Sequence, residues 1–118
     1  MTFGITTDVG LVGGLGMDIS FTGASGDFVG DAGAVNCSTS ISSALALFNK
    51  VSPGNVNAGF IDATGFATPV DLATCLFAST EVVLTTSFNV VVSEATDTSP
   101  SPIVPTPTVV ATSVTPVP

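Results

Sequence analysis

Six of the chain's eight prolines lie in its last segment, from Pro100 to Pro118. Proline fixes φ and has no amide hydrogen, so this segment cannot form a helix and favours an extended backbone. Alternating Pro and Thr are typical of a linker. However, Val109, Val110 and Val114 are good strand residues, which a spacer does not need. The tail sequence therefore predicts an extended strand that is held in place by a partner, and a neighbouring subunit is one candidate for that partner.

The charge balance is strongly acidic, with nine Asp and Glu against a single lysine, Lys50, and a net charge of −8. Such a chain repels phosphates, so nucleic acid is not expected as a partner. The sequence also has no His, Trp or Tyr. Without His, a hydrolytic triad, a His-based metal site and a general base tuned near neutral pH are mostly out of reach. We therefore predict that the protein is not an enzyme and has no catalytic residue, no metal site and no cofactor.

Membrane insertion is not expected, because the apolar runs are short and are interrupted by Gly, Ser or Pro. The N-terminus also lacks the basic region and apolar stretch of a secretory signal. A secreted, extracellular or cell-surface location is inferred instead from the Thr/Pro tail, the scarcity of lysine and the paired cysteines.

Alternating apolar and polar residues predict β-strands along most of the chain. From Leu15 to Phe21 every second residue is apolar, which is typical of a strand with one buried and one exposed face. Many short strands with frequent Gly turns predict an all-β sandwich. The predicted strands are Thr2–Thr7, Leu15–Phe21, Val56–Ile61, Val70–Ala78 and Val82–Val92, with a turn over Val9–Gly14 and a loop over Asp62–Pro69.

One short helix is predicted within this sandwich. A serine is available as its N-cap, and the helix would pack against the sheets. The i, i+3, i+4, i+7 spacing of a helix face is followed by Ile41, Ala44, Leu45 and Phe48.

The segment from Ser25 to Gly33 reads as a Gly-rich loop with two carboxylates, Asp27 and Asp31. Both could contribute to a calcium site, but Ca²⁺ normally takes six to eight oxygens and the EF-hand pattern is absent. A solvated turn is therefore preferred to a metal site.

Cys37 and Cys75 are the only cysteines, an even count in a chain that we expect to be extracellular. We predict a disulfide, with two buried free thiols as the alternative. Closing this loop would stabilise the fold by about 4 kcal/mol. Asn36, Cys37 and Ser38 match an N-glycosylation acceptor, which we interpret as a chance match because a bonded cysteine would hinder the modification.

Several motifs together resemble one family, the cohesin-like domains of secreted bacterial proteins, in particular the variety with a Cys at each of these two places. The resemblance covers roughly Thr2 to Ser93. It implies a jelly-roll β-sandwich that binds dockerin modules or acts as an interaction or scaffold module at the cell surface. The stretches that carry it are GLGMDISF (Gly14 to Phe21), SGDFVGDAGAVNC (Ser25 to Cys37), SALALFN (Ser43 to Asn49), VNAGFID (Val56 to Asp62) and VDLATCLF (Val70 to Phe77).

The chain departs from that family at its ends. The opening strand of such domains is missing before Thr2, while the tail from Pro107 to Pro118 looks like it. A sheet without its edge strand leaves unpaired backbone groups, which any available strand can satisfy. The tail could fold back on its own domain, insert into the next subunit as a donor strand, or be the start of a following repeat.

The expected organisation is a domain over residues 1–93, a Pro/Ser/Thr-rich linker over 94–106 and a strand-forming tail over 107–118. Thirteen extended linker residues span on the order of 40 Å, and their prolines favour an outward path over a tight return. Head-to-tail donation that does not close would grow into a filament.

We therefore predict a structural subunit of an extracellular filament or surface assembly, a homopolymer linked through its tail. The alternative is a monomeric cohesin-like module that binds a dockerin or another surface protein; carbohydrate binding is disfavoured because Trp and Tyr are absent. Replacing Val110 and Val114 by Asp is expected to abolish assembly. The predicted interface residues are Thr108, Val109, Val110, Ala111, Thr112, Ser113, Val114 and Val117.

Overall fold

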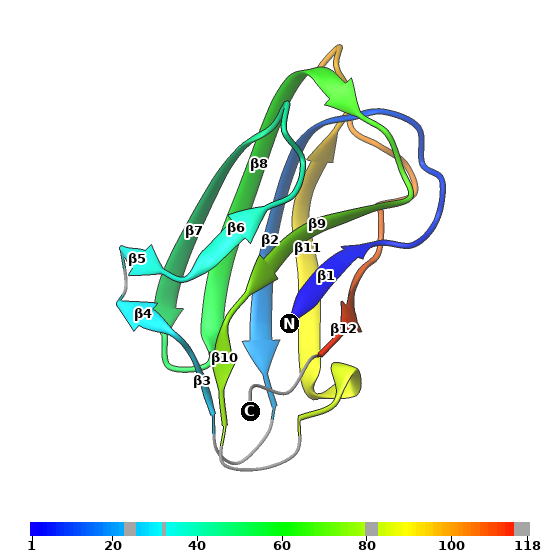
Figure 1. The fold of residues 1–118 in the computed structure, drawn as a ribbon. Helices are drawn as coiled ribbons and strands as arrows, with labels where there is room; N and C mark the ends of the chain where they lie inside the picture. The colour runs from blue at the N-terminus through cyan, green and yellow to red at the C-terminus, as the bar shows by residue number, and fades with distance from the viewer. Residues whose placement is uncertain (23–25, 32, 80–82, 115–118) are drawn as a thin grey trace.

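The computed structural model describes residues 1–22, 26–31, 33–79 and 83–114. In this part of the chain the regular structure consists of antiparallel β-strands and one 3-10 turn, η1 (Thr85–Ser87) (Figure 1). The strands are β1 (Thr2–Ile5), β2 (Val12–Phe21), β3 (Asp27–Phe28), β4 (Gly30–Asp31), β5 (Ala34–Val35), β6 (Cys37–Thr39), β7 (Leu45–Ser52), β8 (Asn55–Phe66), β9 (Val70–Cys75), β10 (Phe77–Ala78), β11 (Phe88–Thr96) and β12 (Val109–Ser113). The prediction of an all-β fold is therefore confirmed.

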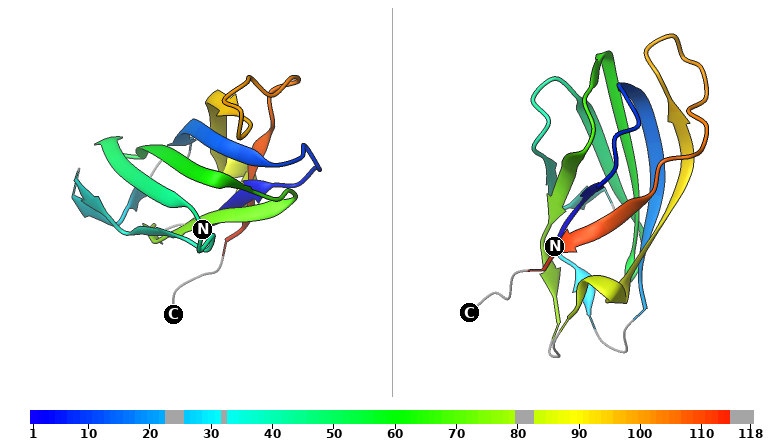
Figure 2. Two further views of the ribbon diagram at one scale, coloured as in Figure 1. Left: turned by 90° about the horizontal axis from the view of Figure 1, so that it is seen from above. Right: turned by 90° about the vertical axis from the view of Figure 1, so that its right-hand side faces the viewer.

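Two four-stranded sheets face each other and enclose the core (Figure 2). The first, the tail sheet, has the strand order β12-β1-β9-β6, and the second, the long sheet, has the order β11-β2-β8-β7. There are also two short ribbons, of which β10-β3 lies toward the bottom of Figure 1 and β4-β5 lies at its left-hand edge. None of the described helical segments is long and apolar enough to cross a membrane.

The long sheet contributes to the core through the inward positions of its two central strands. Met17 and Ile19 on β2 and Ala58 and Phe60 on β8 are each at most 1% exposed. The alternation predicted for Leu15–Phe21 and Val56–Ile61 is confirmed, since these residues fall on the buried face. Both strands are longer than predicted, because β2 begins at Val12 and β8 continues to Phe66.

The predicted helix at residues 41–48 is wrong, because this segment leads into strand β7. Ala46 and Phe48 lie on the inner side of β7, and the Phe48 ring meets the Phe60 ring edge-on at 5.8 Å. Leu45 and Leu47 lie on the outer side, 65% and 71% exposed. A segment this short fits the periodicity of a helix and that of a strand equally well. The pairing of β7 with β8 along its length selects the strand.

The other predicted strands differ mainly in their ends. The Thr2–Thr7 strand is shorter, and the Val70–Ala78 strand is divided into β9 and β10. Of the predicted Val82–Val92 strand, the first residue lies outside the described residues, and strand pairing begins only at Phe88. That strand, β11, extends to Thr96, so the predicted linker begins inside a sheet.

Candidate subunit interface

The tail strand β12 completes the tail sheet by pairing antiparallel with β1 of the same chain. Val109 lies opposite Ile5, Val110 opposite Gly4 and Ser113 opposite Thr2, with a register shift between Thr2 and Phe3. β1 pairs on its other side with β9, so β12 covers the one edge of β1 that would be left unpaired. The tail thus supplies hydrogen bonds that an edge strand requires.

The two faces of β12 are unequal. Val109 is 2% exposed and belongs to the core, and Ala111 and Val114 are partly buried against it. Val110 points the other way and is 40% exposed. Val110 is thus an outer residue of β12, and its backbone pairs with Gly4 in the ladder. Thr108 and Thr112 are exposed, and Val117 lies outside the described residues.

The linker takes a tight return, contrary to the outward path predicted from its prolines. The Asp97 side chain accepts hydrogen bonds from the Ser99 and Ser101 amides at 2.8 and 2.9 Å. The chain then runs back along β11, where the Ile103 amide donates to the Ala95 carbonyl at 3.0 Å. An Asx-type turn from Asp97 to Ser101, which contains Pro100, therefore reverses the chain.

Only a short connection separates this return from β12. Val104 is 86% exposed, and Pro105 and Thr106 are also exposed, whereas Pro107 is buried beside the strand. The path from the bonded Ile103 to the start of β12 at Val109 therefore covers about six Cα–Cα steps, with a reach of roughly 20 Å. This is half of the span expected from the sequence.

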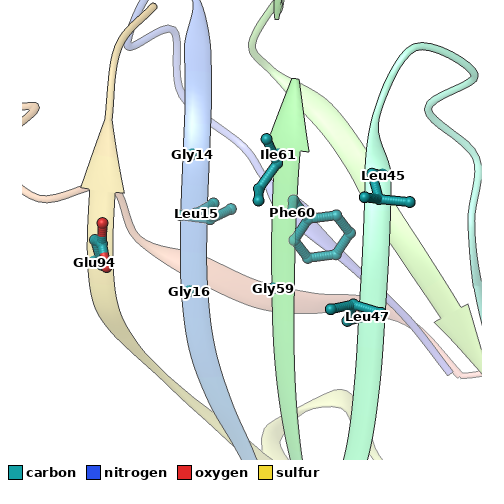
Figure 3. Close-up of a pocket in the computed structure, with 9 residues that line it drawn as sticks. All are labelled: Gly14, Leu15, Gly16, Leu45, Leu47, Gly59, Phe60, Ile61 and Glu94. Atoms are coloured by element: carbon teal, nitrogen blue, oxygen red, sulfur yellow. The ribbon is translucent and has the colours of Figure 1, made fainter. Parts of the chain in front are cut away.

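The outer face of the long sheet carries a shallow apolar groove of about 260 Å³ (Figure 3). Its floor is formed by Gly14 and Gly16 on β2 and Gly59 on β8. Leu45 and Leu47 on β7 stand on one side of this floor, and Glu94 on β11 stands on the other. Ile61 lies on β8 between Gly14 and Leu45. We call this surface the glycine groove.

The predicted disulfide is present and joins residues that lie directly opposite each other on β6 and β9. The two Cα atoms are 4.0 Å apart, and Cys75 is fully buried. The bridge ties the edge strand β6 to the middle of the tail sheet, on the side away from β12. A disulfide of this kind fits an oxidising compartment.

Asp27 is engaged by protein groups instead of being free for a metal. Its Oδ2 atom lies 2.5 Å from Lys50 Nζ, and its Oδ1 atom accepts from the Gly54 amide at 2.8 Å. Lys50 also donates to the Phe28 and Gly30 carbonyls. Burial alone would raise the pKa of Asp27, but the Lys50 and Gly54 bonds outweigh it and lower that pKa. Among the described residues, no group of three or more Cys, Asp or Glu could hold a metal ion.

Asp62, at the upper end of β8, is a second carboxylate fixed by hydrogen bonds. Its side chain is 2% exposed. Ser43 donates to Oδ2 at 2.5 Å, while the Thr64 amide and hydroxyl donate to Oδ1 at 3.0 and 2.7 Å. These bonds, that of Ser43 first, lower the pKa of Asp62. The carboxylate thereby fastens the turn before β7 to β8.

Replacement of Asp62 by Asn is expected to make the free energy of unfolding depend less on pH in the acid range. A carboxylate whose pKa is lower in the folded state than in the unfolded state stabilises the fold fully when the pH is above the unfolded pKa of about 3.9. This stabilisation is lost as the pH falls below that value. Wild type should therefore be more stable than the variant at pH 7, and the difference should shrink below about pH 4. Urea unfolding at pH 7 and pH 3 measures this, and a difference that stays constant would contradict it.

Comparison of the chain with protein-family models, curated proteins and solved structures gives no match. The resemblance to cohesin-like domains therefore remains a prediction from sequence motifs.

The glycine groove is the part of the surface that the sequence interpretation missed. Gly16 was placed on the exposed face of its strand, but Leu45 was assigned to a helix and Gly59 was not singled out. A signal was available, because Gly14 and Gly16 alternate with core residues in β2, and Gly59 does so in β8. Strand glycines often mark close approach of another backbone or ligand.

Proposed function

We propose that the protein is a non-enzymatic structural subunit of an extracellular or cell-surface filament, in which β12 of one subunit completes the β1 edge of the next. The observation that carries this proposal is the way in which the tail is attached. β12 pairs in a ladder with β1, while an exposed connection from Val104 to Thr106 joins it to the rest of the domain. Exchange between copies would keep every contact of β12 and change only this connection.

The reach of the connection limits how such subunits could pack. If Ile103 stays bonded to Ala95, the neighbour's β1 edge must lie within roughly 20 Å of it. Adjacent subunits would then touch, instead of hanging from an extended linker. Direct contact raises the effective concentration of the neighbour's edge, which favours exchange within an assembly over exchange in dilute solution.

The composition of the tail also supports a joint without charges. The described residues of β12 and β1 include no Asp, Glu, Lys or Arg, and the chain's one lysine is paired with Asp27. Attachment would rest on ladder hydrogen bonds and on burial of Val109 and Ala111. Such a joint contains no ion pair that salt would screen.

The finer fold that we propose is the cohesin-like jelly roll, with β12 in the place of the opening strand. In support, β12 lies antiparallel beside β1, the first strand of the chain, at the edge of its sheet. Secretion is proposed from the disulfide and the Thr/Pro-rich tail.

A cysteine pair across the β1–β12 ladder tests whether the tail is exchanged. Thr2 and Ser113 are directly opposed, and neither is buried. In the Thr2→Cys/Ser113→Cys variant, oxidation should join different chains and give a ladder of covalent multimers in non-reducing electrophoresis. Either single variant can at most give a dimer. Negative-stain images of the unmodified full chain should show filaments.

A double variant that oxidises within one chain and runs as a monomer would overturn the proposal. The tail would then complete its own domain, as in the arrangement described above. The protein would instead be a monomeric binding module, and a search for a dockerin-type or other surface partner would follow.

A further inference from the structure

The chain forms a β-hairpin between the domain and the tail strand (orange, at the top of Figure 1). Besides the two bonds that its side chain accepts, Asp97 donates its amide to the Ser101 carbonyl at 2.9 Å. Thr96 and Pro102, on either side of this turn, form an antiparallel β-bridge. Backbone and side-chain bonds therefore close the hairpin together. We call residues 97–103 the clasp.

The clasp lies close to the long sheet at two glycines. A Cβ atom added to Gly13 of β2 would stand 2.7 Å from the Asp97 carbonyl oxygen, and one added to Gly65 of β8 would stand 2.8 Å from Thr98 Cγ2. Gly65 has a φ of +79°, which favours glycine in any case, but Gly13 is not among the glycines with positive φ. Close approach of the clasp therefore accounts for the glycine at position 13.

The clasp sets how far the tail strand can reach. With the clasp closed, the connection starts at Ile103, which is bonded to Ala95, and about six Cα–Cα steps lead to Val109. With the clasp open, the connection would start at Thr96, the last residue of β11, and about 13 steps would span roughly 45 Å. Opening would thus double the reach and free the start of the connection from the sheet.

We infer that the clasp decides whether exchanged tails build an open filament or close into small assemblies. This inference rests on the tail exchange proposed above. Head-to-tail contacts grow into a filament only when the rotation between neighbours does not return the last subunit to the first. A short connection from a fixed point limits that rotation, whereas a long free connection allows two subunits to complete each other reciprocally. Reciprocal completion is favoured wherever the geometry allows it, because the second tail then binds at a high effective concentration.

The Asp97→Ala variant of the full chain tests the inference. It removes the acceptor of the Ser99 and Ser101 amide bonds, so the clasp should open. Negative-stain images should then show loss of the filaments, and sedimentation velocity should show dimers and other small closed assemblies in their place. Asp97→Asn is the matched control, because its side-chain oxygen can accept the same two bonds, and filaments should remain.

Gly13→Ala opens the clasp from the opposite side and should change the assemblies in the same way. Its Cβ atom would meet the Asp97 carbonyl oxygen, so the clasp should be displaced although the Asp97 side chain is unaltered. Hydrogen exchange shows that the clasp alone has opened. In both variants the Ser99, Ser101 and Ile103 amides should lose protection, whereas the β1 amides that face β12 should keep it. Retained protection of the clasp amides in both variants would overturn the inference.

The Thr2→Cys/Ser113→Cys pair separates failure of the inference from failure of the proposed function. With the clasp intact, oxidation should give the ladder of covalent multimers, and with Asp97→Ala added it should give mainly dimers and other short species. The same ladder and the same filaments in both backgrounds would overturn the inference and leave the proposed function standing. Bonds between chains that disappear when Asp97→Ala is added would also overturn it, because the open clasp would then return the tail to its own domain. Bonds within single chains when the clasp is intact would overturn the proposed function and the inference together.

Discussion

Replacement of Val109 by Asp is expected to release β12 from the β1 edge and to lower the free energy of unfolding by about 2–4 kcal/mol. Val109 is 2% exposed and lies opposite Ile5, so an aspartate there would bring an unpaired charge into the core. No cation is at hand to pair with it, since Lys50 is bonded to Asp27. The tail should leave the sheet before the charge is buried.

Hydrogen exchange separates loss of the tail from general unfolding. In the variant, amides of β1 that face β12 should lose protection, whereas those in the middle of β2 and β8 should keep it. Because exchange between copies uses the same contacts, filaments should also disappear from negative-stain images. Normal β1 protection in the variant would show that Val109 does not hold the tail.

Val110→Asp is the matched control, with the same substitution one residue further on. Val110 is 40% exposed on the outer side of β12, so the carboxylate stays in water and the free energy of unfolding should change by roughly 0.5 kcal/mol. This reverses the expectation from the sequence, in which Val110 and Val114 were the residues whose change would abolish assembly. Equal effects of the two substitutions would mean that β12 pairs in a register other than the one described here.

The sequence predicted the strands whose alternation is unambiguous. In β2, apolar residues at Leu15, Met17 and Ile19 alternate with Gly, Asp and Ser, and only a strand with one buried face fits that pattern. The disulfide could also be predicted, because two cysteines in a chain that we expected to be extracellular have one pairing.

The sequence could not decide features that depend on partners far along the chain. Ala44, Leu45 and Phe48 fit a helix as well as a strand, and only pairing of β7 with β8 resolves the choice. The consecutive Val109 and Val110 gave no indication of which one faces inward, because the register with β1 sets it. The glycine groove could not be predicted for the same reason, because Gly16 and Gly59 become neighbours only when β2 pairs with β8.

Removal of the disulfide is expected to have an effect at least as large as loss of the tail. Cys37 and Cys75 close a loop of 38 residues, and the chain-entropy estimate for such a loop is about 4 kcal/mol. The Cys37→Ala/Cys75→Ala variant should therefore unfold at much lower urea concentration, and its melting temperature should fall by roughly 15 °C. β6 should lose the most protection, because it is a three-residue edge strand held otherwise by its ladder with β9 and by hydroxyl bonds such as Thr39 Oγ1 to the Leu72 carbonyl at 2.7 Å.

Reduction of the wild-type protein provides the control for this substitution, because it opens the bridge and keeps both sulfur atoms in place. Reduced wild type should lose nearly as much stability as the double variant, and the small remainder is the packing contributed by the buried Cys75 sulfur. If reduction has little effect but the double variant is strongly destabilised, packing of Cys75 and not closure of the loop stabilises the tail sheet. If neither treatment changes the urea midpoint, the unfolded chain is already restricted in this region and the bridge adds nothing to stability.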